Sequence, residues 1–383
     1  MFMGKRTKQV IRGTATKSTD YEFQVINPWF REHQKVEARE KLVSETSKKG
    51  RMSLYIHVPF CESKCSYCAY VSKAPTAILT DSYFVALNKE IKSFGNSLSK
   101  VQVSSLYFGG GTPTLVPTKL LETISFVHSR FSLEEGAEIT VEAHPKTIPE
   151  DILVSLLTAG VNRISMGVQS FSNVILKLMR RSHTAEEAID AAKRIRAAGF
   201  LRFNIDLIYA YPKQDIKSWM KTLEQAVALC PTGITAYRVR LGNREGNTLL
   251  RKQYENNQKE FPDEALVAEM EAKTKEILGK NGYSEGPAGW FMNEDFLPRQ
   301  LPREPQVYVD RWSDQIPLIG FGVGAYSMGR LSQYQNTNRI QEYIERADAS
   351  KPFALIEKGM VLTKKEAKAA LDWKRGKFSG KKE

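Results

Sequence analysis

The sequence predicts an α/β fold, an open (β/α)6 partial TIM barrel followed by a smaller α+β C-terminal extension. The main observation is that short apolar runs alternate with longer amphipathic runs six times between residues 52 and 241. This alternation is typical of a parallel sheet with right-handed crossovers. Six units are fewer than the eight of a closed barrel, so we expect the sheet to stay open. With 383 residues, 42% of them hydrophobic, the chain can bury a full core.

Each predicted strand is a short apolar run, and the six runs are Met52–Val58, Val103–Phe108, Glu138–Ala143, Arg163–Gln169, Leu201–Ala210 and Gly233–Leu241. The predicted helices lie between them, at Thr80–Asn96, Thr118–Phe131, Pro149–Gly160, Ala185–Gly199 and Ile216–Leu229. The first helix has Tyr83, Leu87 and Ile91 at helical spacing, and Thr80 or Asp81 is its expected cap.

The barrel period ends after residue 241. A charged helix is predicted over Pro262–Gly279, and the Gly, Pro and aromatic segment Tyr283–Trp312 is expected to reach over the open side of the barrel. We therefore divide the chain into a basic N-terminal extension (1–50), a barrel core (51–245), a C-terminal substrate-covering region (246–357) and a basic tail (358–383).

The net charge of +13 is concentrated at the two ends of the chain. Residues 1–50 hold 11 Lys and Arg against 6 Asp and Glu, and residues 358–383 hold 9 against 3, which leaves only +2 in between. We expect these ends to be solvated and weakly ordered. A nucleic-acid role is disfavoured, because it requires a basic face on the folded domain. No apolar run reaches about 18 residues, so no transmembrane helix is expected, and we expect a cytoplasmic protein.

Three of the four cysteines, Cys61, Cys65 and Cys68, lie within YIHVPFCESKCSYCAY, directly after the first predicted strand. Three thiolates on one loop can hold three irons of a cubane iron–sulfur cluster while the fourth iron keeps an open position. Structural zinc is less favoured, because it requires a fourth ligand and Cys230 or His57 is poorly placed to supply it. A disulfide framework is also disfavoured, since four cysteines in a chain of this length without a secretory signal suggest a reducing compartment.

Polar residues follow the predicted strands at the edge where parallel α/β barrels bind ligands. Glu142, Gln169 and Asp206 lie toward the carboxyl ends of three of the strands, and Arg181 and His183 follow the fourth strand. The glycines Gly109, Gly110 and Gly111 follow the second strand; they would let a ligand approach the backbone, with N–H groups free to bind a carboxylate. Each feature alone is compatible with a structural role, but together they predict a site.

The spacing Cys-x3-Cys-x2-Cys, with Tyr67 before the last cysteine, resembles the radical S-adenosylmethionine (SAM) superfamily. LYIHVPFC, LYFGGGTPT, RISMGVQSF, FNIDLIYAYP and GFGVGAYS resemble the group around oxygen-independent coproporphyrinogen III oxidase. That group also contains heme chaperones and class C radical SAM methyltransferases. The resemblance runs from about Met52 to Tyr343.

The resemblance implies cofactors and roles for individual residues. Cys61, Cys65 and Cys68 would bind a [4Fe–4S] cluster, and Tyr55, Gly110 and Glu142 would hold the cluster-bound SAM. The positions that would contact a second SAM are Tyr67, Gly111, Thr112, Gln169, Arg181 and Asp206. His183 would at most orient Arg181. A small-molecule substrate and an electron donor such as flavodoxin or ferredoxin are the implied partners.

The implied activity is reductive cleavage of SAM to a 5′-deoxyadenosyl radical. We expect a class C, two-SAM methyltransferase or cyclopropanase acting on an sp2 carbon, because YVDRW and GVGAYS resemble that branch. Coproporphyrinogen oxidase activity is disfavoured, since Tyr70 stands where those enzymes carry a further cysteine. A heme chaperone-like protein is the alternative. It is weakened because PQVYVDRW lacks the His-Asn pair of that branch, although His57, His144 and His183 remain as possible iron ligands.

Overall fold

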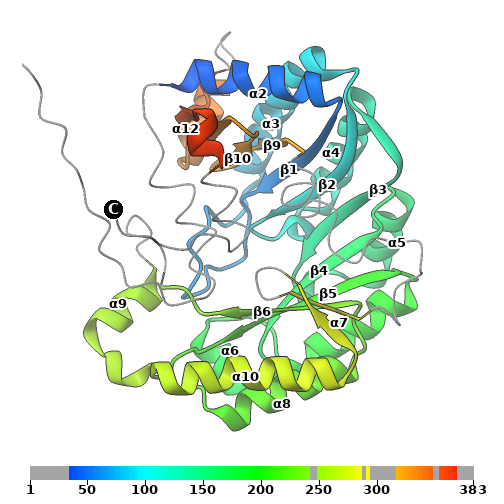
Figure 1. Cartoon of the computed structure of the whole chain (residues 1–383). Helices are drawn as coiled ribbons and strands as arrows, with labels where there is room; N and C mark the ends of the chain where they lie inside the picture. The colour runs from blue at the N-terminus through cyan, green and yellow to red at the C-terminus, as the bar shows by residue number, and fades with distance from the viewer. Residues whose placement is uncertain (1–33, 242–247, 287–289, 294–315, 348–352, 369–383) are drawn as a thin grey trace, which may run out of the picture.

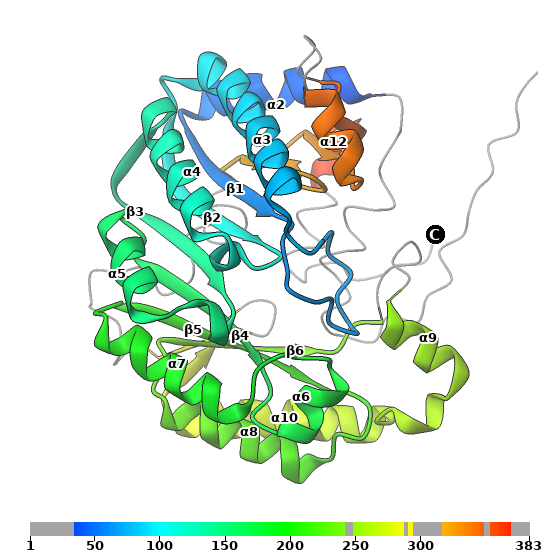
Figure 2. The ribbon, with the colours of Figure 1, turned by 180° about the vertical axis from the view of Figure 1, so that it is seen from behind.

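The computed structural model describes residues 34–241, 248–286, 290–293, 316–347 and 353–368. Six parallel strands form the core of the sheet: β1 (Arg51–Val58), β2 (Gln102–Gly110), β3 (Ser132–Ala143), β4 (Arg163–Gln169), β5 (Arg202–Tyr209) and β6 (Gly233–Arg238). The helices between them are α3 (Ala77–Leu98), α4 (Pro117–Arg130), α5 (Glu150–Thr158), α6 (Asn173–Leu178), α7 (Ala185–Ala197) and α8 (Ile216–Ala228). They cover one side of the sheet (Figures 1 and 2).

The C-terminal part of the chain extends this sheet at both edges. β7 (Tyr283–Glu285) and β8 (Trp290–Asn293) follow β6, whereas β9 (Leu318–Phe321), β10 (Tyr326–Met328), β11 (Ser332–Asn336) and β12 (Ile356–Val361) follow β1. The order is β12-β11-β10-β9-β1-β2-β3-β4-β5-β6-β8-β7, with β9 parallel to β1 and the other added strands antiparallel to their neighbours. The sheet does not close, which confirms the predicted open partial barrel.

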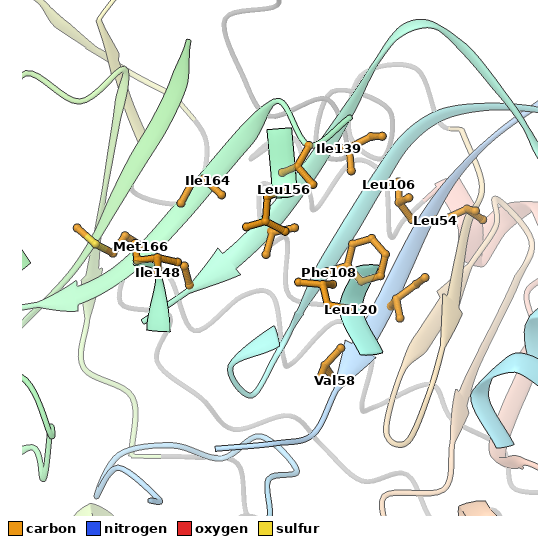
Figure 3. Packing of buried hydrophobic residues seen from close by; sticks show 14 of the residues in the cluster. Leu54, Val58, Leu106, Phe108, Leu120, Ile139, Ile148, Leu156, Ile164 and Met166 are labelled. Atoms are coloured by element: carbon orange, nitrogen blue, oxygen red, sulfur yellow. The ribbon is translucent and has the colours of Figure 1, made fainter. Parts of the chain in front are cut away.

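The hydrophobic core lies between the parallel strands and their helices, as Figure 3 shows for Leu54, Phe108 and Ile164 on the strands and Leu120 and Leu156 on the helices. All five side chains have no exposed surface. Full burial of such a side chain stabilises the fold by about 1.5–3 kcal/mol. Strands that are covered by helices are apolar in sequence, because their side chains are buried. This is why β1, β2 and β4 coincide with apolar runs of the sequence.

Helix α3 begins earlier than the sequence suggests. Its N-cap is Thr76, whose side chain accepts a hydrogen bond from the Leu79 amide at 3.3 Å. Thr80 is buried within the helix, so the prediction that Thr80 or Asp81 caps it is wrong. The local signal was ambiguous because several Thr and Asp residues lie within one turn, and any of them can cap a helix.

The basic ends of the chain are partly ordered, which corrects the expectation that residues 1–50 and 358–383 are weakly ordered. Helix α2 (Lys35–Lys49) buries Ala38 and Leu42. Next to it, the Val361 amide at the end of β12 donates to the Gln34 side chain at 3.0 Å. A few apolar residues on one face were sufficient to anchor a helix that is otherwise charged. Residues 1–33 and 369–383 lie outside the described residues.

Three more helices, α9 (Leu249–Asn256), α10 (Glu264–Lys280) and α12 (Ile340–Ala347), complete the described structure with 3₁₀ turns at Pro113–Leu115, Pro145–Thr147 and Gln258–Glu260. α10 agrees with the predicted charged helix. Most of the segment from 283 to 312, expected to cover the barrel, lies outside the described residues. Across the described ranges, no helix has the length and apolar character needed to cross a membrane.

Candidate active site

The three cysteines lie on a loop, residues 59–73, that leaves the carboxyl end of β1; we call it the cysteine loop. Its two legs are paired, because the Cys61 amide donates to Lys73 O at 3.0 Å and the Lys73 amide donates to Pro59 O at 2.8 Å. Its tip is held by Ser66, whose hydroxyl lies 2.6 Å from the Tyr211 hydroxyl and whose amide donates to Met179 O at 3.2 Å. The loop is therefore fixed at its base and at its tip.

The cysteine sulfurs are half-buried and face polar donors. The Thr112 hydroxyl donates to Cys61 Sγ at 3.7 Å, and Arg181 Nη1 donates to Cys65 Sγ at 3.5 Å. None of the four cysteines forms a disulfide. Burial raises the pKa of the Cys61 thiol and raises that of Cys68 to about 11. These thiols must therefore lose their protons when iron binds, because iron bonds to the thiolate form of cysteine.

The donor set fits a cubane cluster better than a single ion. No three or more His, Cys, Asp or Glu side chains in the described part of the chain are grouped so that one metal ion could be held. A cubane makes a different demand, because each of three thiolates binds its own iron. Hydrogen bonds from Thr112 and Arg181 to the sulfurs also suit an anionic cluster.

Close protein neighbours leave no room for a side chain at the three glycines where β2 ends, Gly109, Gly110 and Gly111. A side chain on Gly109 would meet the Glu142 carboxyl at 2.9 Å, and one on Gly110, which has a φ of +106°, would meet the His57 ring at 2.4 Å. On Gly111 it would come within 2.6 Å of Phe60 O and 2.8 Å of Val58 O. The loop is thus pressed against the end of β1 and the start of the cysteine loop.

The amides of this glycine loop are not free. Gly110 N donates to Glu142 Oε2 at 3.1 Å, Gly111 N to Val58 O at 2.8 Å, and Thr112 N to Phe60 O at 2.7 Å. The expectation that the amides of Gly110 and Gly111 are free is therefore wrong, because both donate within the protein. The glycine pattern indicates a close approach, as expected, but the neighbours are Glu142, the end of β1 and the start of the cysteine loop, which sequence spacing could not reveal.

The residues assigned to the cluster-bound SAM meet at the ends of β1, β2 and β3. Tyr107 OH donates to Glu142 Oε1 at 2.8 Å, and the Tyr107 ring stacks on Tyr55 with ring centroids 6.0 Å apart. Burial and the neighbouring charge of Asp206 raise the pKa of Glu142 to about 7. Tyr107 was missed by the sequence analysis. Its signal was present, since it lies two residues before Gly109 on the same strand, and alternate residues share a face.

Three of the residues assigned to a second SAM, Gln169, Arg181 and Asp206, gather around Gly167 on β4, whereas Gly111 and Thr112 lie against the start of the cysteine loop. A side chain on Gly167 would lie 2.9 Å from Gln169 Nε2 and 3.7 Å from Arg181 Nη2, and Gly167 pairs with Asp206 on β5. Arg181 Nη2 also donates to Gly167 O. Asp206 accepts from the Ser165 hydroxyl at 3.2 Å and from Asn204 Nδ2 at 2.9 Å. Burial raises the pKa of Asp206.

Tyr67 completes this group from the cysteine loop. Its ring meets the Tyr211 ring edge-on at a centroid distance of 6.5 Å, and burial raises its pKa well above the ordinary value. Arg181 lies beside it, close enough for its charge to oppose that rise. The Arg181 Nε atom is buried and has no hydrogen-bond partner. One N–H group of the Arg181 guanidinium, at Nε, is therefore left without an acceptor next to the cysteines.

The histidines that the sequence left open as iron ligands are engaged at both ring nitrogens. His57 Nδ1 lies 3.1 Å from the Tyr55 hydroxyl, and its Nε2 lies 3.2 Å from Val71 O. His144 Nδ1 accepts from the Lys146 amide, its Nε2 meets His183 Nδ1 at 3.2 Å, and His183 Nε2 lies 3.2 Å from Val168 O. Burial lowers the pKa of His144 to about 2 and that of His183 to about 3.

These bonds define a chain of neutral imidazoles. His144 must donate from Nε2, because its Nδ1 accepts, and His183 must then accept at Nδ1 and donate to Val168 O. The structure therefore does not support His57, His144 or His183 as iron ligands. Nor does the structure give His183 a hydrogen bond to Arg181, so His183 does not orient that side chain directly.

Comparison with known proteins agrees with this geometry. Residues 55–226 match the Radical SAM superfamily. The chain is 30% identical to "Heme chaperone HemW" of Lactococcus lactis over 302 residues, which cover 78% of this chain and 75% of that protein. The chain belongs to the radical SAM superfamily. Its similarity to the group around oxygen-independent coproporphyrinogen III oxidase, heme chaperones included, is also confirmed.

A further relative and a solved structure are similar to this chain over most of its length. "Oxygen-independent coproporphyrinogen III oxidase" of Bradyrhizobium diazoefficiens is 29% identical over 320 residues, which cover 81% of this chain and 69% of that protein. The solved structure of coproporphyrinogen III oxidase (HemN) from Escherichia coli superimposes with a TM-score of 0.76 at 24% identity, covering 92% of this chain and 82% of that one. The second comparison shows the shared fold. Membership of the superfamily implies a [4Fe–4S] cluster and SAM.

Proposed function

We propose that this radical SAM protein carries a [4Fe–4S] cluster with SAM bound to it, and that it binds heme in the manner of a heme chaperone. The observation that carries the heme assignment is the similarity to HemW across about three quarters of both chains. The two curated relatives compared above are named as a heme chaperone and a coproporphyrinogen oxidase, and neither name supports the two-SAM methyltransferase expected from the sequence. Tyr70, at the position where coproporphyrinogen oxidases carry a further cysteine, disfavours the oxidase reaction.

The cofactor site is assigned to the cysteine loop and its neighbours. Cys61, Cys65 and Cys68 would bind three irons, and the fourth iron would accept the amino and carboxylate groups of SAM. When reduced, the cluster supplies one electron for the cleavage of SAM. Glu142 would accept a hydrogen bond from the SAM amino group, and burial, which raises its pKa to about 7, leaves this carboxyl only partly ionised near neutral pH. Thr112 and Arg181 stabilise the thiolates by donating to sulfur.

The heme iron would need a ligand other than the buried histidines. His57, His144 and His183 use both ring nitrogens in hydrogen bonds, and withdrawing one would leave a buried partner unsatisfied. Of the histidines in the described ranges, His128 is exposed on α4, away from the strand ends. We therefore expect heme to bind without axial ligation by His57, His144 or His183.

A heme titration tests this proposal. Anaerobically reconstituted protein mixed with heme should develop a Soret band that saturates at a fixed heme-to-protein ratio. The variant His183→Gln should retain that band, while His128→Ala serves as the control for adventitious ligation on the surface. Absence of binding at micromolar heme would remove the chaperone assignment. Loss of the band in His183→Gln would show that the imidazole chain opens to bind iron.

A two-SAM methyltransferase remains a second candidate because of the group around Gly167. Gln169, Arg181 and Asp206 converge there, and Arg181 Nε is a buried donor without a partner. Cleavage of methyl-deuterated SAM, with an electron donor such as flavodoxin or ferredoxin, separates the two candidates. Deuterium in the released 5′-deoxyadenosine would favour the methyltransferase. Unlabelled 5′-deoxyadenosine would count against it.

A further inference from the structure

Glu90 is a buried carboxylate that the proposed site does not use. It lies on α3 and is 5% exposed. Its two oxygens accept three hydrogen bonds, from Gly322 N at 2.8 Å, Asn336 Nδ2 at 2.7 Å and Tyr343 OH at 2.6 Å. These donors come from the loop after β9, from β11 and from α12. Glu90 therefore joins three separate C-terminal segments to a helix of the barrel.

Tyr83, two turns earlier on α3, extends this network toward the cysteines. Its hydroxyl donates to His57 O at 2.6 Å and accepts from the Val323 amide at 3.3 Å. Gly322 has a φ of +100°, and a side chain there would lie 2.5 Å from the Tyr83 hydroxyl and 2.7 Å from His57 O. The loop around Gly322, which Glu90 holds, is thus packed against both Tyr83 and the end of β1.

The network ends on the cysteine loop. The His57 ring reaches Val71 O at 3.2 Å on one leg of that loop. On the other leg, the Phe60 ring packs edge-on against Tyr83 with centroids 5.6 Å apart, and Phe60 directly precedes Cys61. Both legs of the cysteine loop therefore rest on groups whose positions depend on Tyr83 and on the loop held by Glu90.

We propose that Glu90 is a positioning residue for the cluster and SAM site: it holds the Gly322 loop against Tyr83 and His57, and through them sets the position of the cysteine loop. This inference rests on the proposed cluster and SAM site. It also gives the C-terminal segment a role in the chemistry, because α12 and β11 supply two of the three donors. Both carboxylate oxygens accept in this arrangement, so an amide at residue 90 would turn its NH2 group toward the Asn336 Nδ2 donor.

Three variants of the full chain test this positioning role. Glu90→Gln replaces one acceptor oxygen by an NH2 group, and Tyr343→Phe removes one donor and leaves the other two. Tyr283→Phe is the matched control: Tyr283 is also buried and its hydroxyl donates to Pro231 O at 2.8 Å, but it lies on β7 at the opposite edge of the sheet. All three are compared by melting temperature, by hydrogen exchange of residues 59–73, and by SAM affinity of the reconstituted protein.

The positioning role predicts faster exchange in residues 59–73 and SAM affinity weaker by roughly 2- to 30-fold in Glu90→Gln and Tyr343→Phe, the range expected for coupling through a packed network. Tyr283→Phe should lower the melting temperature without either effect. A lower melting temperature in Glu90→Gln with wild-type exchange and SAM affinity would overturn the inference. If Glu90→Gln does not fold, Tyr343→Phe decides.

The same experiment distinguishes failure of the inference from failure of the proposed function. If the wild-type protein takes up no cluster or binds no SAM, the proposed function is wrong. Hydrogen exchange of residues 59–73 still decides the coupling, because it needs neither cofactor. Wild-type exchange in Glu90→Gln and Tyr343→Phe would then reject the inference as well.

Discussion

At the scale of residues, burial controls the protonation of the carboxylates at the strand ends. Glu142 has its pKa raised to about 7 by burial and by Asp206, although Tyr107 and Gly110 donate to it. Two carboxylates share a site that has few compensating charges, so ionising the second is costly. A positively charged ligand group, such as the SAM amino group, would reduce the cost of ionising Glu142. This is a physical reason for assigning the SAM amino group to Glu142.

This raised pKa predicts a pH dependence of stability. The folded protein keeps the Glu142 proton up to about pH 7, whereas the unfolded chain releases it near 4.5, so this group removes stability as the pH rises through that window. Glu142→Gln has no proton to lose. Its free energy of unfolding relative to wild type should therefore rise between pH 4.5 and 7 and level off above it. Denaturant unfolding across this range checks the slope, and a flat difference would contradict it.

SAM affinity should have the opposite pH dependence. If Glu142 binds the SAM amino group, affinity should strengthen as the pH rises toward 7 and the carboxylate ionises. Glu142→Gln should bind SAM more weakly and without that pH dependence. Equilibrium binding to the reconstituted protein measures both effects. Equal affinities for wild type and variant at all pH values would exclude Glu142 from the SAM site.

The assignment of the cysteines gives a second test at this scale. Cys65→Ala should abolish cluster assembly, since two remaining thiolates cannot hold the cubane. Cys230→Ala is the matched control, because Cys230 is also half-buried but follows α8, outside the cysteine loop. Iron and sulfide content after reconstitution separates them. Wild-type content in Cys65→Ala would show that the cluster is held elsewhere.

At the scale of elements, the glycine loop after β2 acts as a spacer for the cysteine loop. Gly111→Ala would place a methyl group 2.6 Å from Phe60 O and 2.8 Å from Phe60 N, where backbone has to move. We expect a loss of about 1–3 kcal/mol in the free energy of unfolding, as for other overpacked sites, together with reduced cluster uptake.

The control for this variant is Gly279→Ala on α10. A side chain there meets nothing within 4 Å. Alanine inside a helix is favoured over glycine by about 1 kcal/mol, so this variant should be neutral or more stable. Thermal unfolding of both variants gives the comparison. A Gly111→Ala protein as stable as Gly279→Ala would mean that the loop can move away from Phe60 without cost.

Elements were predictable where periodicity was strong. The apolar runs from Met52 and Arg163 became β1 and β4, because their alternation with amphipathic helices has only one common solution. Contacts between elements were not predictable. The hydrogen bond from Gly111 to Val58 O and the chain from His144 to His183 depend on how loops from different strands meet. For this reason the sequence predicted a close approach at the glycines, but not the partners to which their amides donate.

At the scale of the whole molecule, the C-terminal part of the chain completes the barrel sheet. β9 pairs with β1 and β8 pairs with β6, so segments from residue 283 onward lie at both edges of the six-stranded core. The sequence suggested an α+β extension but contained no signal for these pairings, since short strands such as β10 have weak periodicity. The site thus lies on a sheet whose two edges are formed by the last quarter of the chain.

The most direct test of the account is electron paramagnetic resonance of the anaerobically reconstituted, reduced wild-type protein with and without SAM. The account predicts the signal of a reduced [4Fe–4S] cluster, and a change in that signal when SAM binds at the open iron. A protein that takes up no cluster, or a cluster signal that SAM leaves unchanged, would contradict the assignment of Cys61, Cys65 and Cys68 to a SAM-binding cluster.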